Sequence, residues 1–222
     1  MTHVVHPYSH RLGILRDWKS RWFSPKGQYK YALRGDILIR KFLDKKLKGF
    51  FIADVEIERS EKALRIIVSS SRPGMIIGRQ GDGAEVIRKD IKNLLLKNKL
   101  LGEKVDVKLD IKEIKNAEAN AAIVAQMVVE GFEKRLPVRR VVKQMLEKVM
   151  ANRDVLGVRI QYAGMIGGGM ARTETFKKGR IPLQTFRADV DYAIGRARLQ
   201  LGAVGIKVWI YKGDIFNGVK NV

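Results

Sequence analysis

The stretch Arg72-Pro73-Gly74-Met75-Ile76-Ile77-Gly78-Arg79-Gln80-Gly81 decides the fold of the first half of the chain. Pro73 suits the first turn of a short helix, because its fixed φ fits that position. Gly78 and Gly81 bracket a two-residue turn whose backbone can approach a sugar–phosphate chain closely. The N–H groups at neighbouring helix ends attract anions. The stretch predicts an RNA-binding loop of Gly78, Arg79, Gln80 and Gly81; the alternative is a turn that only joins two helices.

Upstream of this loop, the periodicity predicts one helix and one hairpin. A helix is expected over residues 29–47, ended by Gly49. Its loosely spaced apolar residues are Leu33, Ile37, Phe42 and Leu47. Residues 52–57 and 64–68 are rich in β-formers and are separated by a polar turn, so they predict a strand hairpin.

Downstream of the loop, Asp82 with Glu85 three residues later predicts a capping box that opens a second long helix. Its apolar stripe is Ile87, Ile91, Leu94 and Leu95. Residues 105–111 alternate as a strand. The order helix, strand, strand, short helix, Gly-x-x-Gly, helix, strand resembles a type II KH domain. A phosphate-binding NTPase loop is disfavoured, because no Gly-Lys-Ser/Thr follows.

The second half of the chain predicts two helices followed by strands. Small residues over 117–132 indicate a closely packed helix, and Pro137 separates it from a helix over 138–150. On that second helix Arg139, Arg140 and Lys143 fall opposite the apolar face, within an arc of about 100°. These three cations predict a ridge that binds phosphates; the alternative is an ordinary solvated face.

Past Gly157 the pattern favours strands at 158–160, 172–176, 186–192 and 206–211. We expect an α+β fold: a type II KH domain followed by a C-terminal α+β domain with two helices packed on a mainly antiparallel sheet. Basic residues near the second of these strands are candidates for further RNA contacts. They are Arg172, Lys177, Lys178 and Arg180.

Charge points to a polyanionic partner. The 222 residues include 44 Lys and Arg against 23 Asp and Glu, a formal net charge of +21. The excess is uneven: residues 1–50 carry 12 basic against 3 acidic residues, whereas residues 51–111 carry 12 against 10. Such a field favours nucleic acid over a merely soluble surface. We expect affinity for phosphate to come mainly from the parts that flank the balanced middle segment.

These patterns divide the chain into an N-terminal basic and aromatic arm (1–28), a KH domain (29–113), a C-terminal domain (114–213) and a tail (214–222). The arm either stacks on RNA bases or packs Trp18 and Trp22 against its own domain. We find no cysteine, no signal-peptide pattern and no apolar run of membrane-spanning length. A cytoplasmic location without membrane or homo-oligomeric partners is therefore expected.

No catalytic or metal-binding arrangement stands out. His3, His6 and His10 share the arm with no carboxylate beside them that would complete a metal site. Asp189 and Asp191 could form a catalytic pair, but a structural role beside Arg187 is favoured. We expect no enzyme activity, no metal and no cofactor.

Several motifs together resemble the bacterial-type family of small-subunit ribosomal protein S-three (S3). They are Arg172-Thr173-Glu174, Gly179-Arg180-Ile181-Pro182-Leu183, residues 186–192, residues 204–210 and, near the start, residues 5–7, 11–14 and 18–23. The resemblance implies 16S ribosomal RNA contacts in the lower head of the subunit, beside proteins S-ten and S-fourteen. It also implies a basic cluster at the messenger RNA entrance, near S-four and S-five, which helps part RNA duplexes without NTP hydrolysis.

Carried over residue by residue, that cluster is Arg139, Arg140 and Lys143. Gln144 departs from the family pattern, because a further basic residue is common there. Two alternatives stay open: a free KH-type regulator that binds RNA away from the ribosome, and an RNA-cleaving or NTP-driven enzyme, for which the sequence shows no motif.

Overall fold

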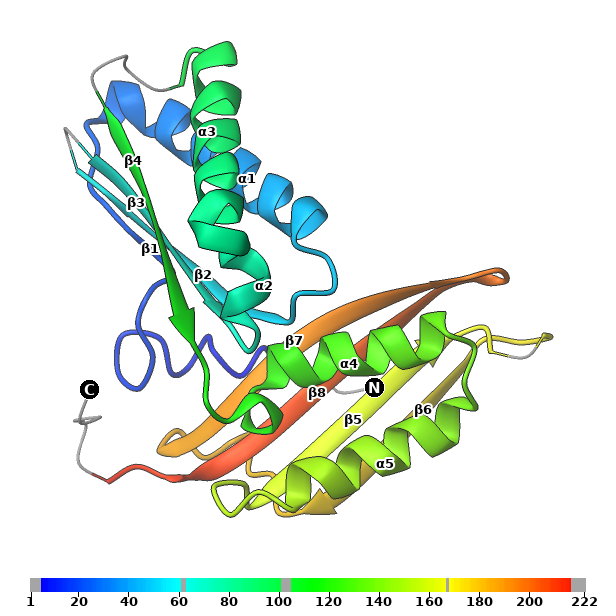
Figure 1. Cartoon of the computed structure of the whole chain (residues 1–222). Coiled ribbons are helices and arrows are strands. Elements are labelled where there is room, and N and C mark those ends of the chain that lie inside the picture. Colours follow the sequence, from blue (N-terminus) through cyan, green and yellow to red (C-terminus); the bar gives the residue numbers. More distant parts are fainter. Residues whose placement is uncertain (1–4, 61–62, 101–104, 167, 217–222) are drawn as a thin grey trace. The chain divides into compact units, whose positions relative to one another are not determined.

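The structure is a computed structural model, and it describes residues 5–60, 63–100, 105–166 and 168–216 (Figure 1). Contacts divide the chain into two compact units: residues 19–115, and residues 1–18 together with 116–222. His3 and residues 217–222 of the expected tail lie outside the described residues. The four-part division made from the sequence stays a prediction. Within the described part, no helix combines the length and the apolar character that crossing a membrane requires.

The first unit has the element order of a type II KH domain, as predicted. Its elements are β1 (Ser20–Arg21), α1 (Lys26–Lys46), β2 (Ile52–Arg59), β3 (Ala63–Ser70), α2 (Pro73–Ile77), α3 (Asp82–Lys97) and β4 (Asp106–Glu113). The strand order is β1-β2-β3-β4. β2 and β3 are antiparallel, whereas β4 runs parallel to β3. The short strand β1 has no counterpart in the sequence prediction.

Helices α1 and α3 share one apolar core with the sheet. Ile87, Ile91 and Leu95 of the predicted α3 stripe are buried there. The stripe predicted for α1 was partly wrong, because Leu33 and Ile37 are 42% and 45% exposed. The buried face of α1 is formed instead by Ala32, Gly35, Asp36, Ile39 and Leu43.

A buried polar contact explains why α1 buries a different face from the predicted one. The carboxylate of Asp36 accepts hydrogen bonds from Arg59, at 2.7 Å, and from the indole N–H of Trp22, at 2.7 Å. A hydrophobicity pattern places an aspartate outside, but a charge that is paired and hydrogen-bonded can be buried. Trp22 therefore packs against the KH unit, whereas Trp18 is 57% exposed.

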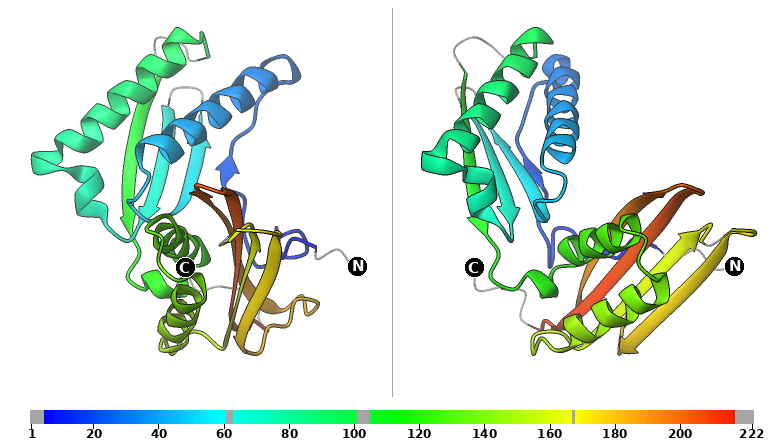
Figure 2. Two further views of the ribbon diagram at one scale, coloured as in Figure 1. Left: turned by 90° about the vertical axis from the view of Figure 1, so that its right-hand side faces the viewer. Right: turned by 45° about the vertical axis from the view of Figure 1, so that its right-hand side comes forward.

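The second unit is the predicted layer of two helices on an antiparallel sheet. Its elements are α4 (Ala121–Glu133), α5 (Val138–Met150), β5 (Gly157–Gly164), β6 (Arg172–Gly179), β7 (Ala188–Leu199) and β8 (Gly202–Asp214). The strand order is β6-β5-β8-β7, and every pairing is antiparallel. Helices α4 and α5 cover one face of this sheet (Figure 2). β7 continues seven residues beyond the predicted strand end at 192.

Capping and packing fix where the two helices lie. Asn120 caps α4, since its side-chain oxygen accepts from the N–H groups of Ala122 and Ile123. Pro137 precedes α5 and separates the two helices, as predicted. The buried residues of α5 are Val141, Val142, Leu146 and Val149, and they form the apolar face of this helix. The opposite face of α5 is therefore held towards solvent.

Candidate RNA-binding site

The Gly-x-x-Gly loop joins α2 to α3 through a single 3-10 turn, Arg79–Gly81. Gly78 and Gly81 have φ values of +74° and +92°, which favour glycine, and Gln80 is also left-handed at +53°. The side chains of Arg79 and Gln80 are exposed. The loop thus presents its backbone and one cation to solvent, beside the N-terminus of α3.

The predicted capping box at Asp82 was wrong. The N-cap of α3 is Gly81, in a left-handed conformation, and no side chain caps this helix. Asp82 lies inside the first turn with Glu85, where negative charge still stabilises a helix N-terminus. Gly81 at the cap leaves the N-terminal N–H groups of α3 without a side-chain acceptor.

A third glycine, Gly83, which was not predicted from the sequence, sets how closely α2 approaches α3. A Cβ on Gly83 would lie 2.7 Å from the carbonyl oxygen of Ile76 and 2.9 Å from that of Ile77. Real Cβ atoms do not come so close, so only glycine allows this approach. The spacing Gly78, Gly81, Gly83 was a signal in the sequence, since a glycine in a helix otherwise costs stability.

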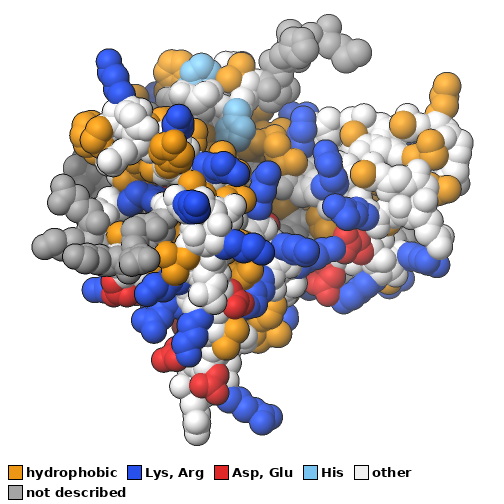
Figure 3. Space-filling view, turned by 90° about the horizontal axis from the view of Figure 1, so that it is seen from above, with side chains coloured by type: hydrophobic (Ala, Val, Ile, Leu, Met, Phe, Trp, Pro, Cys, Tyr) orange, Lys and Arg blue, Asp and Glu red, His pale blue; other side chains and the backbone are white. Residues whose placement is uncertain are grey.

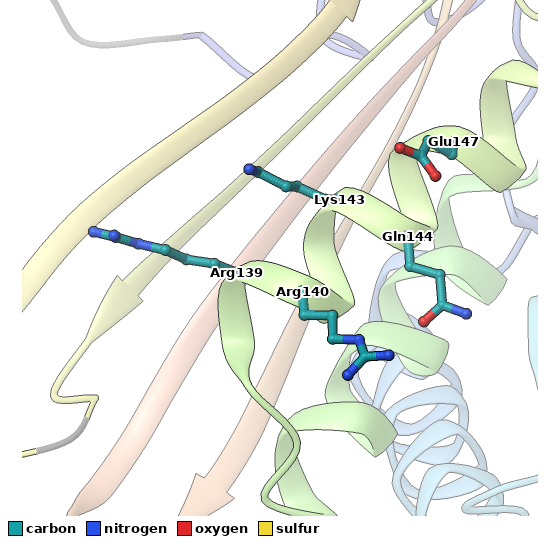
Figure 4. Close-up of a pocket in the computed structure, with 5 residues that line it drawn as sticks. All are labelled: Arg139, Arg140, Lys143, Gln144 and Glu147. Carbon is teal, nitrogen blue, oxygen red and sulfur yellow. The ribbon is translucent and has the colours of Figure 1, made fainter.

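The predicted basic cluster lies together on α5. Arg139, Arg140 and Lys143 are all exposed, and with Gln144 and Glu147 they line a shallow depression of about 490 Å³. Figure 4 shows Arg139 and Lys143 pointing to one side of the helix, and Arg140 and Gln144 to the neighbouring side. The two directions follow from the i, i+4 spacing within each pair.

Arg139 has a partner within the protein. Its Nε and a terminal nitrogen donate to the two carboxylate oxygens of Glu174, at 3.1 and 2.7 Å. The hydroxyl of Tyr162 donates to the same carboxylate at 2.5 Å. Glu174 lies on β6, 35 residues away in sequence. Arg139 therefore borders two depressions: the one on α5, and one of about 460 Å³ that Tyr162, Arg172 and Glu174 also line.

The hydrogen bonds between Arg139, Tyr162 and Glu174 shift the pKa values of all three side chains. Hydrogen bonds from Arg139 and Tyr162 lower the pKa of Glu174 to about 2. The same carboxylate raises the pKa of the Arg139 guanidinium. Burial, with the hydrogen bond to Glu174, raises the pKa of Tyr162 to about 12. At neutral pH the carboxylate is charged, and it offsets one of the three cations predicted to bind phosphate.

The other four candidate contacts do not form one cluster. Arg172 and Lys178 lie on the helix side of β6, because their neighbours Glu174 and Phe176 contact Arg139 and the core. Lys177 lies on the opposite face of that strand, and Arg180 follows its end. All four are exposed.

Two cations of the arm, Arg11 and Arg16, form contacts inside the second unit. Arg11 is fully buried, and its guanidinium donates to the carbonyl oxygens of Pro7, Leu183, Thr185 and Ala188. Arg16 pairs with Asp189 at 3.0 Å and Asp191 at 3.2 Å. The two aspartates therefore have a structural role as partners of Arg16, and Arg187 bonds Asp214. Asp191 also accepts from the N–H of Ala121 at the start of α4.

Basic side chains are spread over the surface seen in Figure 3, with few acidic ones between them, in keeping with the net charge of +21. Such a surface attracts polyanions. A loop of the KH type, an exposed basic helix and this charge define the class of the protein as RNA-binding.

Comparison with known proteins narrows this class. A family profile described as "KH domain" matches residues 38–119, and one described as "Ribosomal protein S3, C-terminal domain" matches residues 128–210. The chain is 42% identical over 216 residues to small ribosomal subunit protein uS3 of Caldicellulosiruptor bescii, covering 97% of this chain and 94% of that protein. It is 37% identical over 223 residues to uS3 of Clostridium tetani, with 100% and 97% coverage.

The chain therefore belongs to the bacterial-type ribosomal protein S3 family. It is a non-enzymatic, RNA-binding structural constituent of the small ribosomal subunit in the cytoplasm.

Proposed function

We propose that α5 lines the entrance for messenger RNA on the small subunit and helps position and unwind it. The proposal extends to 16S ribosomal RNA contacts in the lower head, beside S-ten and S-fourteen, with S-four and S-five as neighbours at the entrance. The observation that carries it is the exposed ridge of Arg139, Arg140 and Lys143 on a helix whose other face is locked in the core.

The ridge can act on RNA without a chemical step. Cations fixed on a rigid helix hold the phosphates of one strand, because the packed residues Val142, Leu146 and Val149 prevent the helix from following the RNA. A duplex pulled past them by the translating ribosome is strained, since only one of its strands is held. The energy comes from translocation, which agrees with the absence of any NTPase motif in the sequence.

The KH loop and the dispersed cations complete the proposed contacts. Gly78, Arg79, Gln80 and Gly81 form an anion-binding turn at a helix N-terminus. Arg172, Lys177, Lys178 and Arg180 are proposed as single phosphate contacts, because they are exposed but separated.

Replacing all three ridge cations tests the entrance role. R139A/R140A/K143A is expected to slow translation through a stable hairpin while leaving an unstructured message unaffected. K26A/K30A/R34A removes three exposed cations from α1 and serves as the charge-matched control. Equal slowing on both messages, or the same result from the control, contradicts the proposal.

A free KH-type regulator is the second candidate, carried by the KH loop alone. Sedimentation of a lysate through a sucrose gradient after a high-salt wash separates the two. We expect the chain with the small subunit, because its relatives match over almost the whole length. Recovery only in light fractions would favour the regulator.

A further inference from the structure

The sheet of the second unit has a face that neither of the two helices of that unit, α4 and α5, covers (Figure 2). Helices α4 and α5 pack on the other face, against Val158, Ile160, Ile206 and Val208. Strand alternation places every second residue of β5 to β8, between these core positions, on the uncovered face. The strand register aligns them in rows: Lys177–Arg159–Trp209–Tyr192, Thr175–Gln161–Lys207–Ile194 and Thr173–Ala163–Gly205–Arg196, with Arg198 opposite Ala203 beyond them.

Among the described residues, other groups of the protein pack on three members of the first row, Arg159, Trp209 and Tyr192. Trp209 is 2% exposed, and the guanidinium of Arg159 lies over its ring at 4.8 Å. His6 of the arm packs edge-on against Tyr192, with ring centroids 4.6 Å apart. In the rows beyond, Gln161 is half-buried and bonded to Arg159, whereas the other side chains are exposed, Ile194 to 64%. We call the exposed residues of these rows the open floor: Ala163, Thr173, Thr175, Lys177, Ile194, Arg196, Arg198, Ala203, Gly205 and Lys207.

The open floor has cations and no acid. Lys177, Arg196, Arg198 and Lys207 lie on it, and none of its residues is Asp or Glu. Within the part of this unit that the structure describes, Lys177, Arg196 and Lys207 form no ion pair. Four like charges on one small surface repel one another, so a face of this kind is favoured when an anionic partner neutralises it.

The outer face of the KH sheet shows the opposite arrangement. There Arg65 bonds Glu58 on β2, at 3.4 Å, and Asp110 on β4, at 2.5 Å. Arg21 on β1 also pairs with Glu58, at 3.4 Å. Arg21 and Arg65 on that sheet are therefore balanced by acids of neighbouring strands, as expected for a face exposed to water. The two sheets of one chain therefore differ in how their outer cations are matched.

The shape of the open floor indicates whether it would bind an RNA backbone or stack on single-stranded bases. Ala163, Ala203, Gly205, Thr173 and Thr175 are small and leave the middle flat, between Lys177 at one end of the rows and Arg196 with Lys207 at the other. Side chains for base stacking are absent from the described residues of the floor, whose one large apolar group is Ile194. Backbone recognition needs cations and hydroxyls, whereas single-strand recognition needs exposed rings.

We propose that the open floor docks on the phosphate backbone of structured ribosomal RNA, on the opposite side of the sheet from α5. This inference rests on the proposed function, because it divides the RNA contacts of one domain between two faces. The helix face meets the incoming message, and the strand face anchors the domain to the subunit.

The charge contribution can be measured with R196A/R198A/K207A. The binding partner is a small subunit prepared without this protein, and the full-length variant is added to it. We expect this binding to depend less on salt, with the slope of log K against log salt becoming shallower by about 2 to 3. R65A/K108A/K112A removes three exposed cations from the KH sheet and is expected to leave the slope nearly unchanged. An unchanged slope in the first variant, or equal losses in both, overturns the proposal.

The chain has no cysteine, so a single introduced thiol can report its neighbour. T175C carrying a short aryl azide should cross-link to 16S ribosomal RNA in reconstituted subunits. Cross-links only to a ribosomal protein overturn the docking proposal. So does maleimide labelling of the unmodified T175C thiol in the assembled subunit. Q144C on α5, with the same probe, tests the entrance separately: its failure to reach messenger RNA leaves the floor's result intact.

Discussion

Arg139 on α5 and Glu174 on β6 are joined by two parallel hydrogen bonds of 3.1 and 2.7 Å. The first cation of the ridge is therefore already paired with a carboxylate of the protein. A carboxylate and a phosphate present similar oxygen pairs to a guanidinium. RNA that contacts Arg139 must therefore displace or share Glu174. Arg140 and Lys143 have no such partner among the ion pairs of the described residues.

Releasing Arg139 should strengthen the ridge. E174Q keeps an acceptor for Tyr162 but removes the charge that competes with phosphate. We expect tighter binding of the full chain to single-stranded RNA, with a salt slope steeper by about 0.7, the value of one added phosphate contact.

Two further variants isolate this effect. Adding R139A to E174Q should cancel the gain, and E118Q, an exposed acid elsewhere in the unit, should produce little change. A gain that persists without Arg139 would mean that Glu174 acts through general charge alone.

Gln144 offers a gain of function. It lines the same depression as the three cations and points to the side of Arg140 (Figure 4). Q144R should add a phosphate contact, steepen the RNA salt slope by about 0.7 and speed translation through a hairpin. Q28R, the same change on the exposed surface of α1, is the control. No difference between these variants would show that the ridge does not extend to residue 144.

Gly83 should be intolerant of any side chain. In G83A the new Cβ must push α2 away from α3, a strain of about 1–3 kcal/mol. We expect faster hydrogen exchange at residues 73–81 and weaker binding of single-stranded RNA. G74A is the matched control, because a Cβ there meets nothing within 4 Å. Equal behaviour of the two variants would show that the approach of α2 to α3 is unimportant.

Asp191 should make the second unit sensitive to acid. Burial alone would raise its pKa, but Arg16, Lys212 and the hydrogen bonds from Tyr8 and Ala121 outweigh burial and lower it. Its contribution to stability is therefore present above the ordinary aspartate value of about 3.9, and is lost as pH falls below that.

D191N removes this contribution at neutral pH. Breaking a buried pair costs about 3 kcal/mol, so urea should unfold the second unit at a lower concentration. Acid below about pH 4 should reduce the stability of D191N less than it reduces that of the wild type. D106N, at an exposed aspartate, tests for a general charge effect. An unchanged acid response in D191N would remove Asp191 from the explanation.

Local periodicity was enough to predict most elements. Ile87, Ile91 and Leu95 repeat every four residues and are buried where that repeat requires. The face of α1 was mispredicted because size was weighted over position: Leu33 and Ile37 are large but exposed, whereas Asp36 is buried through its bonds to Arg59 and Trp22. Those bonds join different elements, so no local pattern contains them.

The ends of elements depend on backbone angles that side-chain patterns do not report. Asp82 and Glu85 have the spacing of a capping box, but Gly81 already occupies the cap in a left-handed conformation. The last residues of β7 include Ala193, Gly195 and Ala197, which have little strand preference. The pairing with β8 and the close packing of Gly195 under Val129 on α4 hold them extended.

In the candidate site, too, relations within one element could be predicted from the sequence, and relations between elements could not. Helical spacing placed Arg139, Arg140 and Lys143 together, because that relation lies within one element. The sequence did not reveal that Glu174 would meet Arg139, or that Asp191 would meet Arg16, 175 residues away. Charge counting treats every cation as available, whereas the fold uses Arg11 and Arg16 internally and leaves those of the ridge exposed.

The most direct test of the central claim is a cross-link from α5 to messenger RNA. Q144C carrying a short photoreactive probe would be incorporated into subunits that hold a defined message at a fixed codon. We predict a cross-link to message nucleotides downstream of that codon, lost when the message is too short to reach the entrance. Cross-links to ribosomal RNA or protein alone, whatever the length of the message, would contradict the assignment of α5 to the messenger RNA entrance.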